Sequence, residues 1–410
     1  MHPSQVARAS GLRARLGGGL NFKPGDVSYF RSNPGLGWVL ANAAQNIDST
    51  QYSKFRLDAK GLYTVTQPNI TADAQNILIK SAFRNPSDGL VYFQQNNLRD
   101  LYKKPGPLLD STLVSTVPNP SGYWDASSYR FLGFQNGLAI YVANEANNSG
   151  YWGVWYSTNP GFTTWASTFM SAAQTVKIGD VLWTGNRWLV AGSGLFVGNT
   201  LNNTMTRPTH LSGPLNVNSV VWGKLWKVGS AIYAWASGGE VIAKSTDDGL
   251  SWTTYIPTNT PYRMTDVAST VIYSPTYDIW FGITGGNVLV YAIDPTGTWT
   301  TLSAAGIVNS GYGIGLVDML DPGGVMLATH QGLHFINMAS PQNVQSISSM
   351  GLYGFGGSSY QSPTLFLDNS MLTWCGYNTR WYRCYSPLER CNPPTLAAIG
   401  DRTPYMRVAP

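Results

Sequence analysis

Residues that could carry acid–base, nucleophilic or metal chemistry are few in this sequence and are spread along it. The 410 residues include 21 Asp and Glu, four His and three Cys. Cys375, Cys384 and Cys391 form no Cys-x-x-Cys pair and have no histidine close in sequence, so they predict buried free thiols rather than a zinc site. The sequence therefore predicts no metal site and no cofactor.

The acidic residues fall mostly in predicted turns, such as Asp247-Asp248 and Asp321. Most glycosidases need two carboxylates placed on either side of a glycosidic bond. No such pair can be assigned in this sequence. We therefore expect no catalytic residues and a protein that is not an enzyme.

One segment combines turn-forming and aromatic residues at a defined spacing, namely Ser245-Thr-Asp247-Asp-Gly249-Leu-Ser-Trp252. Here the aspartate can accept main-chain N–H bonds within the turn, the glycine can take the left-handed conformation, and the tryptophan can pack back on the outer strands. The segment resembles the Asp-box of sialidase-like and other Asp-box β-propellers and departs from that pattern only at Ser251. A degenerate copy has Ser157, Asn159, Gly161 and Trp165, and a poorer one covers 294–299.

The Asp-box resemblance implies a structural role, because in that family the motif joins the third and fourth strands of a blade, away from the axis. A sialidase-like enzyme would also hold its substrate with three arginines and use a tyrosine nucleophile helped by a carboxylate. The family's Arg-Ile-Pro type of motif is missing, and the nearest segment, Phe30-Arg31-Ser-Asn-Pro34, lacks its pattern. A glycosidase or depolymerase that acts on host surface glycans remains the alternative, with no marked site.

The elements that must position these residues form a repeat, in which a short apolar run, a tight turn and a second apolar run with an aromatic residue follow one another. One copy is Phe131–Phe134 followed by Leu138–Ala143. The second runs of six copies begin at residues 138, 187, 231, 278, 325 and 371, so the steps are 49, 44, 47, 47 and 46 residues. A fainter copy lies at 77–93. Repeats of about 40 to 50 residues with several short strands are typical of β-propeller blades.

The composition agrees with this repeat. Charged residues are 11% of the chain, against about 25% in ordinary domains, and aromatic residues are 13%. The aromatic content excludes a disordered chain, and the composition is unlike that of long helices. We expect an all-β fold, a β-propeller of about seven blades (six possible), with a small N-terminal β module and an extended N-terminal arm. A pair of β-sandwiches or a β-helix is the alternative, but neither gives a repeat of about 47 residues.

The N-terminal region carries a second resemblance. Gly37-Trp38, Asp48–Phe55 and Tyr63–Ile70 together resemble the tail-collar-type segment of bacteriophage tail fibres. We expect Trp38, Tyr52 and Phe55 to form the core of this small module. The predicted domains are a basic, Gly-rich arm (1–24), the tail-collar-like module (25–76) and the β-propeller (77–410).

The net charge of +5 arises partly at the start of the chain, where Arg8, Arg13, Arg15 and Lys23 precede the first acidic residue. We expect this arm to hold a neighbouring subunit, an expectation from its composition. No cluster of Lys and Arg with interleaved aromatic residues predicts nucleic-acid binding. No apolar stretch reaches the ~18 residues of a membrane span, and residues 1–21 lack the apolar core of a secretory signal, so synthesis in a host cytoplasm without membrane insertion is expected.

Together the two resemblances imply a structural protein of a bacteriophage tail, located in the virion. The favoured role is a fibre or adhesin that takes part in host attachment, and the alternative is a tail hub or nozzle that binds only other virion proteins. Expected partners are other tail proteins, a host surface glycan or protein receptor, and further copies of the chain as a trimer or hexamer. Aromatic side chains can stack on sugars, and the candidate contacts, for which blade packing is the alternative role, are Tyr123, Trp124, Tyr151 and Trp152.

Overall fold

A computed structural model of the chain consists of β-strands and, in the part it describes, one short 3-10 helix, η3 (Val217–Ser219). The all-β fold expected from the composition is confirmed. None of the described helices is long and apolar enough to cross a membrane. The residues that the structure describes are 27–31, 38–40, 47–48, 64–65, 70–72, 79–95, 99–105, 111–118, 129–144, 152–159, 161–170, 178–202, 204–261, 271–286, 288–302, 315–319, 324–329, 332–338, 344–348, 364–367, 370–375, 380–384, 390–392, 398 and 400–407.

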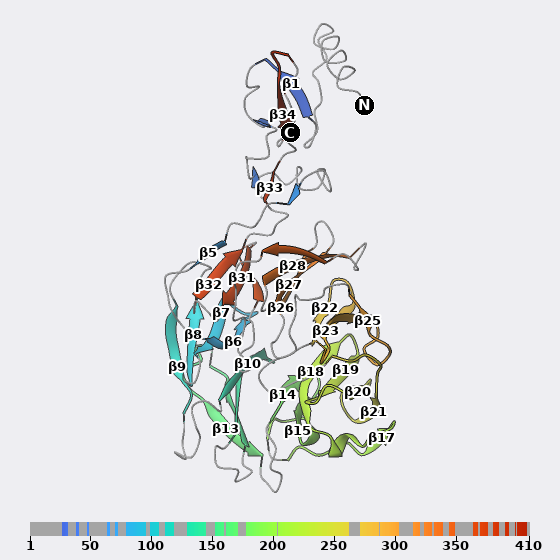
Figure 1. Ribbon diagram of the computed structural model, residues 1–410. Helices are drawn as coiled ribbons and strands as arrows, with labels where there is room; N and C mark the ends of the chain where they lie inside the picture. The colour runs from blue at the N-terminus through green and yellow to red at the C-terminus, as the bar shows by residue number, and fades with distance from the viewer. Residues whose placement is uncertain are drawn as a thin grey trace. The chain divides into compact units, whose positions relative to one another are not determined.

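Seven sheets of three to five strands follow one another along the described part of the chain (Figure 1). Most strands adjacent in sequence lie side by side in their sheet. Two strands are exceptions: β17 directly precedes β18 in the chain but lies beside β21, and β5 lies beside β32. The sheets are β6 (Ile79–Arg84), β7 (Val91–Gln95), β8 (Asp100–Lys104) and β9 (Thr112–Thr116); β10 (Arg130–Gln135), β11 (Leu138–Asn144), β12 (Trp152–Ser157) and β13 (Ala166–Met170); β14 (Asp180–Trp183), β15 (Trp188–Gly192) and β16 (Gly194–Gly198); β18 (Trp222–Val228), β19 (Ala231–Ala236), β20 (Ile242–Ser245) and β21 (Ser251–Tyr255), with β17 (His210–Ser212) beside β21; β22 (Val271–Ser274), β23 (Ile279–Ile283), β24 (Leu289–Ala292) and β25 (Thr300–Thr301); β26 (Gly315–Met319), β27 (Gly324–Thr329), β28 (Gly332–Asn337) and β29 (Val344–Ser348); and β30 (Thr364–Leu367), β31 (Ser370–Cys375) and β32 (Arg380–Cys384), with β5 (Ile70–Ala72) beside β32.

This series of small sheets is the β-propeller that the repeat predicts, with each sheet as one blade. The second apolar runs of the repeat fall on the second strands of six sheets, β11, β15, β19, β23, β27 and β31. The fainter upstream copy falls on β6 and β7. The predicted number of about seven blades agrees with the seven sheets in the described part of the chain.

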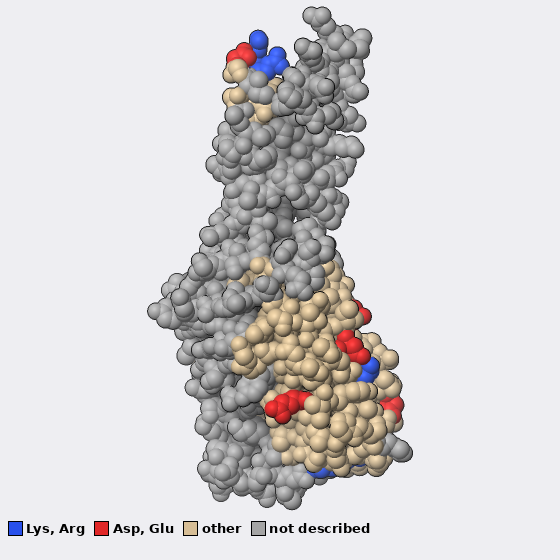
Figure 2. All heavy atoms as spheres, turned by 45° about the vertical axis from the view of Figure 1, so that its right-hand side comes forward, with Lys and Arg blue, Asp and Glu red and all other residues tan. Residues whose placement is uncertain are grey.

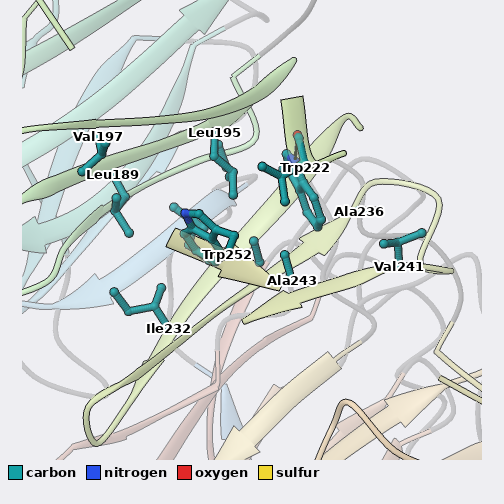
Figure 3. Close-up of a cluster of buried hydrophobic side chains, with 13 residues drawn as sticks. Leu189, Leu195, Val197, Trp222, Ile232, Ala236, Val241, Ala243 and Trp252 are labelled. Atoms are coloured by element: carbon teal, nitrogen blue, oxygen red, sulfur yellow. Dashed lines mark hydrogen bonds between the residues drawn. The ribbon is translucent and has the colours of Figure 1, made fainter. Parts of the chain in front are cut away.

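The hydrophobic core lies between successive sheets, because each sheet has two apolar faces. Alternate residues of β19 show this directly. Ile232 and Ala234 pack with Leu189 and Trp252 in one buried cluster (Figure 3), whereas Tyr233 and Trp235 pack with Trp280 in the next. Successive residues of a strand point to opposite faces of the sheet, so this one strand contributes to two cores.

The last sheet is completed by a strand from the other end of the propeller sequence. β5 precedes β6 in the chain but lies beside β32, in a sheet of order β30-β31-β32-β5 (Figure 1). This pairing joins the first and last parts of the propeller, which closes the ring of blades. The predicted boundary placed 70–72 in the N-terminal module, and the structure assigns this strand to a propeller sheet instead.

A second unit is built from both ends of the chain. Two small sheets have the orders β1-β34-β2 and β3-β33-β4, where β1 is Val27–Phe30, β2 is Trp38–Leu40, β3 is Ile47–Asp48, β4 is Thr64–Val65, β33 is Arg390–Asn392 and β34 is Thr403–Arg407. The compact units accordingly are 1–70 with 319–324 and 384–410, and 71–318 with 325–383. The structure therefore differs from the prediction that the propeller extends to residue 410, because β33 and β34 pair with N-terminal strands. Trp38, expected in the core of this module, is half-buried and packs edge-on against Phe30 at 4.8 Å, while Tyr52 and Phe55 lie outside the described residues.

Connections between blades cover the outer edges of two sheets. β17 pairs in parallel with β21, so that Leu211 lies opposite Trp252. In the next sheet Thr258 forms a parallel bridge with Thr298, and the N–H of Trp299 donates to the Thr258 carbonyl at 3.0 Å. An uncovered edge strand presents unpaired N–H and C=O groups that promote aggregation, so these segments protect the rim of the propeller.

Candidate functional site

The residues expected to contact a receptor lie mostly outside the described part of the chain. Tyr123, Trp124 and Tyr151 are outside it, as are the arm residues Arg8, Arg13 and Arg15. Trp152 is the first residue of β12 and pairs with Asn144 and Met170, but its side chain is not among those described. The structure therefore brings none of these side chains together in a described site.

The turn between β20 and β21 contains Ser245, Asp247, Gly249 and Trp252, and it is held by a dense set of hydrogen bonds. The Asp247 carboxylate accepts bonds from the N–H of Ser251 at 2.9 Å and from its hydroxyl at 2.5 Å. The Ser245 hydroxyl donates to Asp247 at 2.8 Å and accepts from the Gly249 N–H at 3.0 Å. The indole N–H of Trp252 donates to the Gly249 carbonyl at 2.9 Å.

Gly249 occupies a position that tolerates no other residue easily. Its φ is +86°, in the left-handed region that favours glycine. A Cβ atom there would lie 2.3 Å from Cδ2 of Leu189 in the neighbouring sheet. The same turn is linked to that sheet by the Asn186 amide, which donates to Asp248 at 2.7 Å. This turn thus fixes the contact between two blades.

The pKa of Asp247 is lowered from its ordinary value. Partial burial acts to raise this pKa, but the hydrogen bonds from the side chain and N–H of Ser251, from Ser245 and from Leu250 together outweigh burial. These donors stabilise the charged form of the Asp247 carboxylate within the turn. A carboxylate so engaged is suited to holding a turn.

The turn between β12 and β13, which contains Ser157, Asn159, Gly161 and Trp165, repeats the main-chain part of this arrangement. The Asn159 side-chain oxygen accepts from the Thr163 N–H at 2.9 Å. The positive φ falls on Phe162 (+51°) rather than on Gly161, and the Phe162 ring is buried. The indole of Trp165 donates to the Ser115 hydroxyl at 3.1 Å instead of to its own turn. The extra residue before Trp165 accounts for this change of partner.

The poorer copy at 294–299 lies between β24 and β25. Asp294 accepts from the N–H and hydroxyl of Thr296 at 3.0 and 2.8 Å. The indole of Trp299 donates to the Pro295 carbonyl at 3.1 Å, and its side chain is buried. All three turns therefore join the third and fourth strands of their sheets, and in two of them a tryptophan closes the turn by bonding its carbonyls.

A set of side chains that was not predicted from the sequence links the sheets to each other. The amide of Gln135 donates to the Val181 carbonyl at 2.7 Å and accepts from the Trp183 N–H at 2.6 Å. The fully buried amide of Gln94 bonds the Tyr129 carbonyl and the Phe131 N–H in the same way, each at 2.8 Å. Each side-chain amide thus forms the same two hydrogen bonds, one donated and one accepted, that a main-chain peptide group of a paired strand would form. Its partners lie in or directly before the first strand of the next sheet. A glutamine in an apolar strand, facing a buried position, was the only signal for these links.

A buried carboxylate links the next pair of sheets. Asp180 accepts from the Val181 N–H at 3.0 Å and from the Leu225 N–H at 3.1 Å, and it lies 3.0 Å from the Lys224 ammonium. Its side chain is 6% exposed and that of Lys224 22%. Because the charge is paired and its oxygens are hydrogen-bonded, this group holds sheets together.

Charged side chains are sparse on the described part of the face that Figure 2 shows. Figure 2 shows scattered acidic and basic side chains among a majority of other residues. Two isoleucines are prominently exposed, Ile256 at 60% and Ile293 at 72%. No group of three or more His, Cys, Asp or Glu side chains that could hold a metal ion occurs among the described residues.

Comparison with known proteins shows the fold alone. No protein-family model and no curated protein matches the sequence. A solved structure of YCF48 bound to a D1 peptide has a TM-score of 0.51 at 13% identity, covering 78% of this chain and 96% of that one. The virginiamycin B lyase of Staphylococcus aureus has a TM-score of 0.52 at 9% identity, covering 78% and 99%. A chain of the Mitotic Checkpoint Complex has a TM-score of 0.52 at 11% identity, covering 79% and 93%. Proteins of such different roles share the propeller, so the fold does not define the function.

Proposed function

We propose that the chain is a structural component of a bacteriophage tail, a fibre- or adhesin-type protein of the virion that takes part in host attachment through its β-propeller. The tail-collar-like segment at Gly37-Trp38 and Asp48–Phe55 supports the assignment to a tail. The propeller supports a binding role, because a ring of blades presents loops at two faces. Under this proposal the chain acts without a catalytic site.

The division of the chain into two compact units supports this proposal most strongly. Both ends of the chain belong to a unit of their own, and the propeller sequence is inserted between them. β5 and β32 pair within a propeller sheet, so the propeller is complete without β33 and β34. An assembly could therefore hold the terminal unit while the whole propeller stays available for a second partner. This division of tasks is what an attachment protein requires.

We further assign the turn Ser245–Trp252 as an Asp-box with a structural function. Its support is the bonding of the Asp247 carboxylate to Ser251 and of the Trp252 indole to Gly249. In this role the motif stabilises the outer part of a blade and binds no ligand. The same assignment at Asn159 is weaker, since Trp165 bonds outside its turn.

The proposed receptor contacts are Tyr123, Trp124, Tyr151 and Trp152. The low charged fraction of the chain, 11%, and its aromatic content suit recognition by stacking and neutral hydrogen bonds. A propeller of similar fold was solved with a bound peptide, so a protein receptor fits the proposal as well as a glycan does. The basic arm with Arg8, Arg13 and Arg15 would contact another tail protein.

The experiment that tests the proposal is mass spectrometry of purified phage particles, followed by imaging with a labelled antibody against the chain. We expect the chain in the particle, at the distal part of the tail. A position at the tail hub or nozzle, in six copies and covered by other proteins, would replace host attachment with the assembly role. Release of reducing sugar from host polysaccharide by the purified chain would show instead that the chain is a glycosidase.

A further inference from the structure

The last strand of the chain is held on both sides by N-terminal strands. Met406 lies between Val27 of β1 and Val39 of β2, and Tyr405 lies between Ser28 and Leu40. Both pairings are antiparallel, and the sheet order is β1-β34-β2. Without β34, the two flanking strands would stand two strand spacings apart, about 10 Å, with their inner N–H and C=O groups unpaired. β1 and β2 therefore form a slot that needs a strand.

Side chains add specificity to this slot. The Tyr405 ring packs edge-on against Phe30, with centroids 6.2 Å apart, and Phe30 packs against Trp38 at 4.8 Å. An exposed ion pair joins Arg31 to Asp401 at 3.0 Å, but exposed pairs contribute little. Recognition in the slot thus rests on main-chain pairing, as in other cases of strand addition, with the aromatic contact setting the register.

The segment that carries β34 can leave without opening the propeller. The ring of the propeller is closed by β5 and β32. Neither β33 nor β34 belongs to any of the seven propeller sheets. β33 is anchored separately, with Cys391 between Ile47 and Val65. The ten residues 393–402 connect the two strands and begin with Pro393-Pro394. Fully extended, a connection of this length spans roughly 35 Å.

We propose that the slot between β1 and β2 is a strand-acceptor site, and that in the assembled oligomer its occupant is Thr403–Arg407 of a second copy of this chain. β33 stays in its own subunit, and residues 393–402 carry β34 across to the neighbour. The exchange forms every contact that the strand makes within one chain, so it costs little beyond the association itself. The strand exchange does not depend on what the propeller binds. If the exchange is disproved, the proposed function in host attachment is therefore unaffected.

Cysteine pairs at facing positions test this exchange. Chains with Val27→Cys are co-expressed with chains with Met406→Cys, and the products are oxidised and separated without reductant. We expect a disulfide-linked dimer of two different chains. Each single variant, oxidised alone, should not give this dimer, and these samples also control for disulfides of Cys375, Cys384 and Cys391. Ser28→Cys with Tyr405→Cys is the second pair, because only alternate pairs in an antiparallel ladder have the closer spacing.

The control is the double variant that carries both cysteines in one chain. A double variant that closes only within the chain, together with monomers alone from the mixed single variants, overturns the proposal. Should neither pair close, the mass of the unmodified chain in solution is compared with that of a chain ending at residue 402. A smaller oligomer after removal of β34 supports the exchange, and an unchanged oligomer contradicts it.

Discussion

The side-chain amide of Gln135 accepts a hydrogen bond from the main-chain N–H of Trp183 at 2.6 Å. This bond joins two sheets that pack face to face and have no main-chain ladder between their first strands. Gln94 and Asp180 make corresponding links before and after it. Hydrophobic packing holds the blades together but is not directional, so these polar links fix how far each blade can slide against the next.

Replacing the buried glutamine tests this view. In Gln94→Leu the Tyr129 carbonyl and the Phe131 N–H lose their partner while they stay buried. We expect the free energy of unfolding to fall by about 2–5 kcal/mol, since each orphaned buried group costs about 1–3 kcal/mol. Denaturant unfolding measures the loss. Gln94→Glu keeps the acceptor for the Phe131 N–H and loses the donor to the Tyr129 carbonyl. Because Gln135 is half-buried, we expect a smaller loss of stability in Gln135→Leu. Losses below about 0.5 kcal/mol in all three variants would show that these links do not stabilise the fold.

The turn glycine offers a matched pair of substitutions. Gly249→Ala places a methyl group 2.3 Å from Leu189 at a φ of +86°, whereas Gly137→Ala has a φ of +73° and meets nothing within 4 Å. We expect a loss of about 1–2 kcal/mol at Gly137 from backbone strain alone and about 2–5 kcal/mol at Gly249, where overpacking adds to strain. Thermal unfolding compares the two. Equal losses would mean that the contact with Leu189 has no energetic weight.

The Asp247 carboxylate predicts a dependence on pH. Its pKa is lowered in the folded protein because the hydrogen bonds from Ser251, Ser245 and Leu250 outweigh burial. A lowered pKa contributes stability that is present above the ordinary aspartate pKa and is lost as the pH falls through the lowered one. We expect Asp247→Asn to remove this acid dependence while keeping the turn, since Asn159 fills the same role in the other turn. Asp247→Ala should also cost about 1 kcal/mol at neutral pH. Asp248→Asn is the control, since it removes a neighbouring carboxylate of the same turn. If the stability of Asp247→Asn falls at low pH as much as that of the unmodified chain, the Asp247 carboxylate is not the source of the pH dependence.

The buried ion pair predicts a non-additive cycle. Lys224→Met leaves the Asp180 carboxylate buried without its cation, so we expect a loss of about 3–5 kcal/mol. In the double variant Asp180→Asn/Lys224→Met the charge is gone, and the amide oxygen can still accept from Leu225. We expect the double variant to be more stable than Lys224→Met alone. A double variant whose loss equals the sum of the two single losses would show that the pair is not coupled.

Much of the propeller could be predicted from the sequence because its evidence is local. Each hairpin is a short apolar run, a turn and a second run, so residues 138, 231 and 278 mark β11, β19 and β23 directly. Pairing across long separations left no such trace. β5 joins β32 across some three hundred residues, and β34 joins β1 and β2 from the other end of the chain. Short strands of this kind have no periodicity long enough to show which partner they take.

The candidate site could be predicted only where a turn motif marks it. Asp247, Gly249 and Trp252 act within eight residues, so their spacing indicates their geometry. Gln94, Gln135 and Asp180 act between sheets, and only the packing of the blades gives them a function. Receptor contacts such as Trp124 and Trp152 stay predictions, because a loop aromatic and a packing aromatic have the same sequence signal.

Competition for host cells measures whether the propeller takes part in host attachment. Purified chain is added to host cells before the phage particles, and the rate of particle adsorption is measured against the same amount of a Trp124→Ala/Trp152→Ala variant that unfolds at the same temperature. We predict that the unmodified chain slows adsorption by tenfold or more at saturation and that the variant does so much less. Adsorption at an unchanged rate in the presence of saturating, folded chain would contradict a role of the propeller in host attachment.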